Sequence, residues 1–259
     1  MMKEDTGNNA VYLAWQAPDT RRWHVVGLLK QHEQRYVFNY TQGAFTSDKF
    51  VPFIGMSDLQ TVYYSQALFP LFGNRILSPK RPEFPCFVKW LGLTEQASPF
   101  EILSRSGGAR TTDNLQVFKP LIPAQDGMLE YYFFAHGLRH LPQSAADRVS
   151  QLKAGDVLSL QRDYDNKYDG CATLVCATNP QENVGFCPAY ITEDIVNLLE
   201  QKDTNLQLMV EKLCEDAPYQ YRLLCKLQGQ VDIALRGKLM STDEFRPVVD
   251  NADSCNSGV

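Results

Sequence analysis

A polar run between two apolar segments holds the densest group of chemically active side chains in the chain. Residues 158–175 read LSLQRDYDNKYDGCATLV. The apolar residues at both ends predict two strands joined by a polar loop. The loop side chains can bind cations, donate hydrogen bonds or stack on rings: Arg162, Asp163, Asp165, Asn166, Lys167, Tyr168 and Asp169. Because Asp, Asn and Gly also favour tight turns, one interpretation is a long hairpin turn with no further role.

A calcium site in this loop is excluded by its ligand positions. Counting from Asp165 places Gly170 where an EF-hand needs glycine. Lys167 then stands at the third ligand position and Cys176 at the twelfth, and neither offers the required oxygen.

A magnesium site is the enzymatic alternative. Three carboxylates could hold Mg²⁺ for nuclease chemistry: Asp163, Asp165 and Asp169. The amide, ammonium and phenol groups between them favour binding over metal chemistry, so we expect a non-catalytic protein with neither a metal nor a cofactor.

Histidine and cysteine predict no zinc site and no disulfide framework. His136 and His140 are four residues apart, but no Cys-x-x-Cys pair accompanies them. The seven cysteines are odd in number and irregularly spaced, which favours buried free thiols in a reducing compartment.

The composition is typical of a globular protein. The 259 residues suit one large domain or two small ones. A formal net charge of −5 argues against a broad basic face that coats duplex DNA, although a few cations could still dominate one cleft. No apolar run approaches the roughly 20 residues that span a bilayer, and the first nine residues are polar, so we expect a cytoplasmic protein.

Two domains of the α+β class are predicted. Residues 119–127 carry two prolines and end in glycine, which predicts a linker. The domains are residues 10–118, of mixed α+β structure, and residues 128–248, with a polar tail at 249–259. Short strands with few helices in the second domain predict a small antiparallel β-barrel of the OB or SH3 type with two helices.

Hydrophobic patterns predict the individual elements. Strands are expected at 10–15, 23–29, 36–40, 131–136, 156–162, 172–177, 183–186, 206–213 and 221–227, and helices at 145–152 and 193–200. Thr192 is the expected cap of the last helix. Helical spacing also runs through residues 59–72, with Pro70 ending or kinking that helix.

A further helix is predicted to start at Ser98. Ser98 and Glu101 form a capping-box pattern, and Pro99 suits the first helical position. Gly107 and Gly108 predict where the helix stops.

Separated motifs in the second half resemble the HIRAN domain family. That pattern has G-x-R, then G-D-x-L-x-L-x-R-D, N-x-Y-D and V-G-[YF]-x-P. The chain shows GLR at 137–139, GDVLSLQRD at 155–163, NKYD at 166–169 and VGFCP at 184–188, in the same order. The resemblance spans about residues 131–200 and extends to about 247.

The resemblance implies a fold similar to small OB-type barrels and a site for the end of a nucleic-acid strand. Some HIRAN domains grip the 3′-hydroxyl end of single-stranded DNA. By matching motif positions, the implied binding residues are Arg139, His140, Arg162, Asn166, Lys167, Tyr168, Asp169 and Phe186.

The residue types are consistent with that role. Arg139 can bond a phosphate bidentately. Tyr168, His140 or Phe186 can stack on a base. Asp169 can accept a hydrogen bond from a free terminal hydroxyl, and its charge would repel the phosphate of a continuing chain. DNA and RNA stay open as ligands, as does the strand end that is read.

The first half resembles the opening of HipA-type kinases. Residues 26–29 (VGLL) and 36–40 (YVFNY) resemble the V-G-x-L and F-x-Y strands of that family, and residues 68–75 (LFPLFGNR) resemble its F-F-x-N-L-L-P helix. No nucleotide-gripping loop or catalytic aspartate follows, so the resemblance implies a relative of the N-terminal subdomain without the kinase core.

The second resemblance implies a protein partner. A separate HipA-like kinase, or another component of a bacterial toxin–antitoxin, stress or phage-defence system, would contact Leu68, Phe69, Phe72 and Arg75. One alternative is that these residues are simply core packing. Another is that the whole chain is an antitoxin-like interaction module without DNA binding. The oligomeric state is left open.

Overall fold

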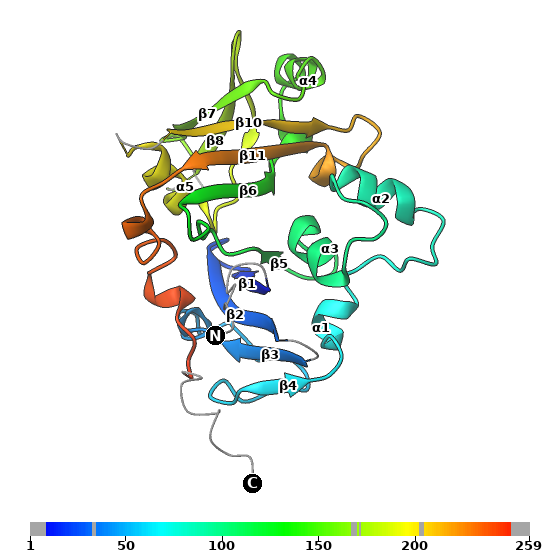
Figure 1. The fold of residues 1–259 in the computed structure, drawn as a ribbon, viewed down its shortest axis with the longest axis vertical. Coiled ribbons are helices and arrows are strands. Elements are labelled where there is room, and N and C mark those ends of the chain that lie inside the picture. Colours follow the sequence, from blue (N-terminus) through cyan, green and yellow to red (C-terminus); the bar gives the residue numbers. More distant parts are fainter. Residues whose placement is uncertain (1–8, 33–34, 167–169, 171, 202–204, 250–259) are drawn as a thin grey trace. The chain divides into compact units, whose positions relative to one another are not determined.

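The computed structural model describes residues 9–32, 35–166, 170, 172–201 and 205–249 (Figure 1). Its contacts divide the chain into two compact units. The first unit comprises residues 1–76, 107–120 and 241–259, and the second comprises residues 77–106 and 121–240. Residues 77–106, which the sequence division placed in the first domain, therefore lie in the second unit, and residues 241–248 lie in the first.

The first unit is built on a five-stranded antiparallel sheet in the order β4-β3-β2-β1-β5. Its strands are β1 (Ala10–Gln16), β2 (Trp23–His32), β3 (Arg35–Tyr40), β4 (Tyr63–Ser65) and β5 (Leu115–Phe118). Its helices are short: η1 (Gln42–Phe45), α1 (Pro70–Gly73) and η5 (Asp243–Phe245). The three predicted N-terminal strands are confirmed, because their β-branched and aromatic residues pack well on a pleated surface.

An aromatic cluster on β3 forms the centre of this unit. Phe38 and Tyr40 are fully buried, with ring centroids 5.0 Å apart, and Phe72 packs on Phe38 at 5.8 Å. The Tyr40 hydroxyl donates to the Met56 carbonyl at 2.7 Å and accepts from the Phe53 amide at 2.8 Å. Burial raises the pKa of Tyr40 to about 12, so the hydroxyl keeps its proton and holds the loop around residue 53 on the sheet.

The helix predicted over residues 59–72 is wrong. Tyr63–Ser65 forms strand β4, and a single helical turn begins at Pro70 rather than ending there. Proline lacks an amide hydrogen, which the first helical position does not need, so the residue starts this helix. The apolar spacing reflects packing on the sheet instead.

Arg75 is held inside the first unit by four hydrogen bonds. Its guanidinium donates to both carboxylate oxygens of Asp113, at 2.6 and 3.1 Å, and to the carbonyls of Gly108 and Leu71 at 2.9 Å. Only 2% of its side chain is exposed. The pair ties the α1 turn to the loop that enters β5.

The second unit contains a six-stranded antiparallel sheet in the order β6-β11-β10-β7-β8-β9. The strands are β6 (Met128–Phe134), β7 (Val157–Arg162), β8 (Thr173–Thr178), β9 (Gln181–Phe186), β10 (Asn205–Leu213) and β11 (Leu223–Gln230). All six were predicted within a few residues, and residues 119–127 carry no helix or strand.

The helices of this unit lie before, between and after the strands. They are α2 (Phe84–Trp90), α3 (Pro99–Ser106), η2 (Leu138–His140), α4 (Gln143–Ser150), α5 (Thr192–Leu199), η3 (Tyr219–Tyr221) and η4 (Ile233–Leu235). Helix α2 was not predicted. Thr192 is the first residue of α5 rather than its cap, and its hydroxyl donates to the Pro188 carbonyl at 2.9 Å.

Helix α3 confirms the predicted capping box. The Ser98 amide donates to the Glu101 carboxylate at 2.8 Å, and the Glu101 amide donates to the Ser98 hydroxyl at 3.2 Å. Gly107 and Gly108, at φ of 71° and 56°, end the helix in the left-handed region where glycine is favoured.

The edges of the second sheet meet at one point. His136, just beyond β6, and Phe186, the last residue of β9, exchange two backbone hydrogen bonds of 2.9 Å. The predicted α+β class is confirmed, but in the described part of the second unit the strands form no closed barrel of continuous ladders. A single bridge joins the two edges.

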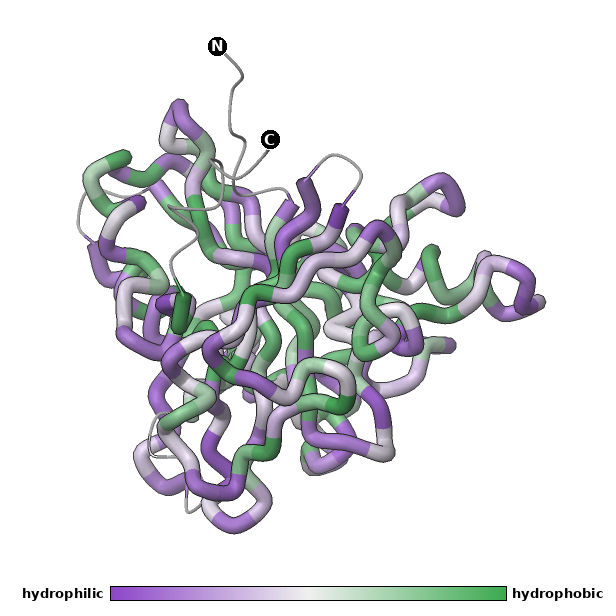
Figure 2. Tube along the Cα trace, turned by 90° about the horizontal axis from the view of Figure 1, so that it is seen from below, coloured by the Kyte–Doolittle hydropathy of each residue, from purple (hydrophilic) through white to green (hydrophobic). Residues whose placement is uncertain are grey.

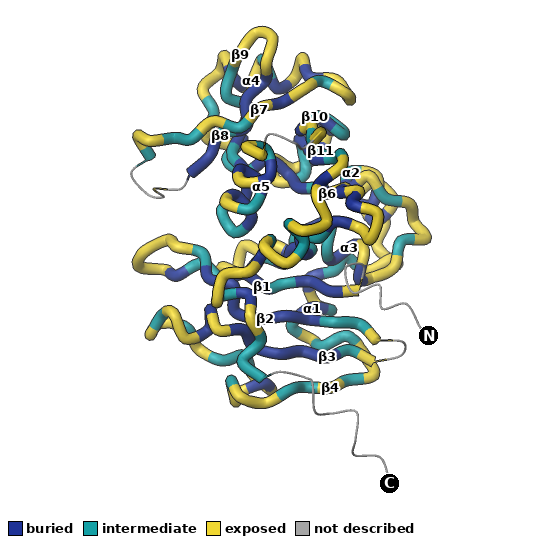
Figure 3. The backbone as a smooth tube through the Cα atoms, turned by 60° about the vertical axis from the view of Figure 1, so that its left-hand side comes forward, coloured by how far each residue is buried: buried dark blue, intermediate teal, exposed yellow. Residues whose placement is uncertain are grey.

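Burial follows the strands in both units. Figure 3 shows the buried residues running along β1, β2 and β3, with β4 and the loops more exposed. Short hydrophobic and hydrophilic stretches alternate along the chain (Figure 2). Among the described residues, no helix has both the length and the apolar character needed to cross a membrane.

Replacing Arg75 by alanine should destabilise the first unit by about 2–3 kcal/mol, because the partly exposed Asp113 carboxylate and two carbonyls lose a buried hydrogen-bonding partner. Urea unfolding followed by tryptophan fluorescence measures this, since Trp15 and Trp23 both lie in the first unit. The control is Arg22→Ala, which breaks an ion pair whose arginine side chain is 69% exposed and should cost about 1 kcal/mol or less. Equal losses for the two variants would contradict the structural role of Arg75.

Candidate nucleic-acid interface

A left-handed turn presents Arg139 and His140 to solvent. Gly137 has φ of 77° and precedes the short helix η2, whose His140 amide donates to the Gly137 carbonyl at 2.9 Å. Leu138 is buried and anchors the turn, whereas Arg139 and His140 are exposed. The glycine is required twice, for its backbone angle and because a Cβ there would lie 2.8 Å from the Phe186 ring.

The end of β9 lies directly against this turn. Phe186 is bridged to His136, and its half-buried ring covers Gly137. A Cβ on Gly185 would lie 3.0 Å from the His136 carbonyl oxygen. The GLR and VGF motifs, which are 45 residues or more apart in sequence, therefore pack on each other through two glycines.

The polar loop begins at the end of β7. Arg162 is the last residue of that strand and pairs with Thr173 on β8. The Asp163 amide donates to the Ala172 carbonyl at 2.9 Å, and the Asn166 side-chain amide donates to the Asp163 carboxylate at 3.0 Å. A compact turn thus opens the loop.

The remaining candidates of this loop lie outside the described residues. Lys167, Tyr168 and Asp169 therefore have no described position, and neither does Cys171. The structure describes five of the eight implied binding residues: Arg139, His140, Arg162, Asn166 and Phe186.

Strand register brings the placed candidates to one end of the sheet. Thr173 pairs with Arg162 on one side, and its carbonyl accepts a hydrogen bond from the Cys187 amide at 2.9 Å on the other. Phe186, next to Cys187, bridges to His136, which leads into the Arg139 turn. One row of backbone pairs therefore runs from Arg162 across β8 and β9 to the turn.

Sequence reasoning missed Tyr164. Its side chain lies in the loop just after Arg162 and is 90% exposed. An aromatic residue within a run of aspartates and asparagine was the available signal, because an exposed ring can stack on a base.

The groups behind the row are uncharged at neutral pH. Burial lowers the pKa of His136 to about 4, and its ring meets Tyr190 edge-on at 6.3 Å between centroids. Burial also raises the pKa of the Cys187 thiol to about 12, with nearby Arg162 opposing this shift only in part. The charges of the placed site are therefore those of the exposed Arg139, the half-buried Arg162 and the loop carboxylates.

The placed residues offer no metal centre. Within the described ranges, no group of three His, Cys, Asp or Glu side chains could hold an ion. Cys176 and Cys187 are buried free thiols, as the sequence predicted. The carboxylate trio of the nuclease alternative includes Asp169, which lies outside the described residues.

Residues 128–232 match the family model of the HIRAN domain. The segment is therefore similar to the HIRAN domain family. The resemblance predicted from the motifs over 131–200 is confirmed, and the match continues through β11. HIRAN domains are known from DNA-binding proteins, so the match supports a nucleic-acid-binding role for the segment.

Two solved structures are similar to the chain at low scores. One is a protein from Lactobacillus plantarum, with 21% identity over 40% of this chain and 97% of that chain, at a TM-score of 0.31. The other is the HIRAN domain of human HLTF, with 17% identity over 47% of this chain and 93% of that chain, at a TM-score of 0.33. No curated protein matches the chain. The resemblance of the first half to the HipA-type subdomain stays a prediction.

Replacing Gly137 by alanine should displace the Phe186 ring from the left-handed turn at residue 137. The change adds a methyl group 2.8 Å from the ring at a left-handed backbone angle, and we expect a destabilisation of about 2–4 kcal/mol. Gly155→Ala is the matched control, because Gly155 has φ of 90° but no atom within 4 Å of its Cβ position. Urea unfolding of both variants separates the cost of the left-handed backbone angle from the cost of the clash with Phe186. An equal loss of unfolding free energy in the two variants would show that contact with Phe186 is unimportant.

Stability should fall as the pH drops from 6.5 towards 4, in part because of His136. The unfolded chain takes up this proton near the ordinary pKa of 6.5 and the folded chain only near 4, so acid favours the unfolded state between these values. The contribution lost between about pH 7 and pH 5 is about 2 kcal/mol. His136→Gln should flatten the pH profile of unfolding by that amount, and an unchanged profile would contradict an imidazole that stays neutral in the folded chain.

Proposed function

We propose that the protein binds single-stranded DNA at a free 3′ end through its HIRAN domain and does not catalyse a reaction. The observation that carries the proposal is the row of backbone pairs that joins Arg162, Thr173, Cys187 and the Arg139 turn. It supports a single site built from motifs that are distant in sequence.

The placed side chains fit the end of a strand. Arg139 and Arg162 supply two guanidinium groups, and each can form two hydrogen bonds to the oxygens of a phosphate. His140 and Phe186 offer rings for a terminal base, at about 1–3 kcal/mol for each stacked base. Such a small cluster suits an acidic protein, since it needs no basic face over the rest of the surface.

We assign to Asp169, from its position in the motif, the discrimination between a free 3′-hydroxyl and a 3′-phosphate. A carboxylate accepts a hydrogen bond from a terminal hydroxyl and repels a phosphate in the same place. The loop turn formed by Asp163 and Asn166 begins the segment that carries it.

A protein partner for the first unit is part of the proposal. Of the residues implied by the HipA resemblance, Phe72 and Arg75 are buried and Leu68 and Phe69 are half-buried. Their burial supports the alternative that this segment is core packing, so a partner surface is better sought elsewhere on the unit.

Fluorescence anisotropy tests end recognition with a labelled oligothymidylate that carries either a 3′-hydroxyl or a 3′-phosphate. We expect the phosphate to weaken binding at least about tenfold, because like charges in one site cost more than 1.4 kcal/mol. Asp169→Asn should bring the two affinities together. Equal affinities for the two strands in the unaltered protein would contradict the proposal.

The arginines are tested in the same assay. Arg139→Ala should weaken the binding of both oligonucleotides equally. It should also reduce the slope of log affinity against log salt concentration by about one. Lys153→Ala is the control, because Lys153 is exposed in the same unit but lies outside the row. Cleavage of the strand in the presence of Mg²⁺ would favour the nuclease alternative instead.

A further inference from the structure

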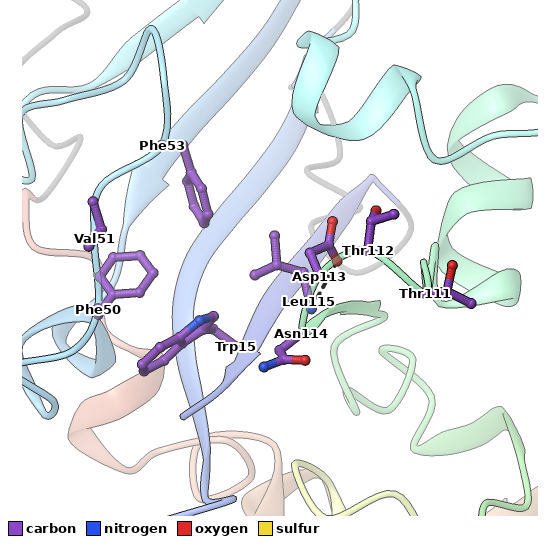
Figure 4. Close-up of a pocket in the computed structure, with 9 residues that line it drawn as sticks. All are labelled: Trp15, Phe50, Val51, Phe53, Thr111, Thr112, Asp113, Asn114 and Leu115. Carbon is purple, nitrogen blue, oxygen red and sulfur yellow. Dashed lines mark hydrogen bonds between the residues drawn. The ribbon is translucent and has the colours of Figure 1, made fainter. Parts of the chain in front are cut away.

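A cleft in the first unit is lined by residues that are not among those proposed to bind a strand end. Its volume is about 310 Å³, at the small end of the range for ligand pockets. Figure 4 shows Trp15, Phe50 and Phe53 on one side and the loop of residues 111–115 on the other. All of these residues belong to the first unit.

The aromatic side is a fixed wall. Phe50 meets Trp15 edge-on at 5.3 Å and Phe53 at 5.5 Å between ring centroids. The Phe53 amide is bonded to the buried Tyr40 hydroxyl at 2.8 Å, which anchors the wall to the sheet. The cleft is therefore preformed, and a ligand need not order it on binding.

The opposite side is polar but carries no free charge. The Asp113 carboxylate is neutralised by the buried Arg75 guanidinium and also accepts from the Leu115 amide at 3.2 Å. The Asn114 carbonyl accepts from the Gln16 amide of β1 at 2.9 Å, so the loop is tied to the sheet. The hydroxyls of Thr111 and Thr112 and the amide of Asn114 belong to exposed residues.

The lack of unpaired charge in the cleft favours a neutral ligand. The nine residues that line the cleft include no Lys, Arg or His. The nearby Lys49 is paired with Asp48 at 3.5 Å. A nucleotide phosphate would find no cation in the cleft, which argues against a nucleic-acid site.

The rim favours a protein as the source of that ligand. Val51 is 73% exposed and Ile54 is fully exposed in the loop that carries Phe50 and Phe53. Exposed apolar side chains in a loop that lines an aromatic cleft add surface that a protein partner would bury.

A hydrogen-bond donor completes the pattern. The contacts of Trp15 are ring contacts with His24 and Phe50, and among the described residues none accepts a hydrogen bond from its indole N–H. Rigid aromatic walls with a tryptophan donor suit an extended, proline-containing chain, whose rings pack on the aromatics and whose carbonyls accept hydrogen bonds.

We propose that this cleft binds an extended, neutral, proline-containing segment of a partner protein. Proline rings pack against Phe50 and Trp15, the Trp15 N–H donates to a carbonyl of the segment, and Asn114 and the threonines bond its backbone. Apolar residues beyond the proline cover Val51 and Ile54.

Two-dimensional NMR of the ¹⁵N-labelled full chain tests the proposal through its three tryptophan indole signals, those of Trp15, Trp23 and Trp90. The probes are blocked peptides that alternate proline with leucine, the same peptides with glycine and serine in place of proline, and adenosine monophosphate. We expect the proline peptides to shift the Trp15 signal selectively at up to about 1 mM, the weak end of specific binding.

Variants locate the binding. Trp15→Phe keeps an aromatic ring but removes the indole N–H donor. It should weaken peptide binding about fivefold, as the loss of one hydrogen bond does. Val51→Ser should weaken it about threefold through lost apolar contact. Ile233→Ser, at an apolar side chain that is 52% exposed in the second unit, should have no effect.

Three results would overturn the proposal. One is the absence of a Trp15 shift with any proline peptide in a folded chain, as judged by unchanged Trp23 and Trp90 signals. Another is a shift with adenosine monophosphate but not with peptide, which would indicate a nucleotide site. A Trp15 signal that moves with protein concentration alone would indicate a second copy as the occupant.

Discussion

The two backbone hydrogen bonds between His136 and Phe186 are the constraint on which the candidate site depends. They are the point at which the edges of the six-stranded sheet meet. Without them the GLR turn would be connected to the polar loop only through the whole width of the sheet. With them, the turn lies one bridge and two strands away from Arg162.

Close approach at this bridge explains two of the motif glycines. Gly137 leaves room for the Phe186 ring, and Gly185 leaves room for the His136 carbonyl. Each also adopts a positive φ that other residues rarely take. His136 and Cys187 behind the bridge are uncharged, so they add nothing to the positive charge of Arg139 and Arg162.

Much of this arrangement could be predicted from the sequence, and the exceptions have physical causes. The strands and the Ser98 capping box follow from local patterns, which act over a few residues. The HIRAN motifs predicted the order of the site elements. The apolar spacing near Pro70 was misleading because burial against a sheet can mimic a helical face. Helix α2 has Pro82 two residues before it and Pro85 as its second residue, and prolines so close together are typical of a loop. The bridge and the burial of Arg75 depend on residues far apart in the chain, which no local pattern reveals.

The central claim is that one end of the HIRAN sheet binds a strand end, and NMR mapping of the bound strand tests it most directly. A short oligothymidylate with a free 3′-hydroxyl would be titrated into the ¹⁵N-labelled chain. The account predicts that the largest amide shifts fall on Arg139, His140, Tyr164, Asn166 and Phe186. Shifts confined to the first unit, or spread evenly over exposed lysines and arginines of both units, would contradict it.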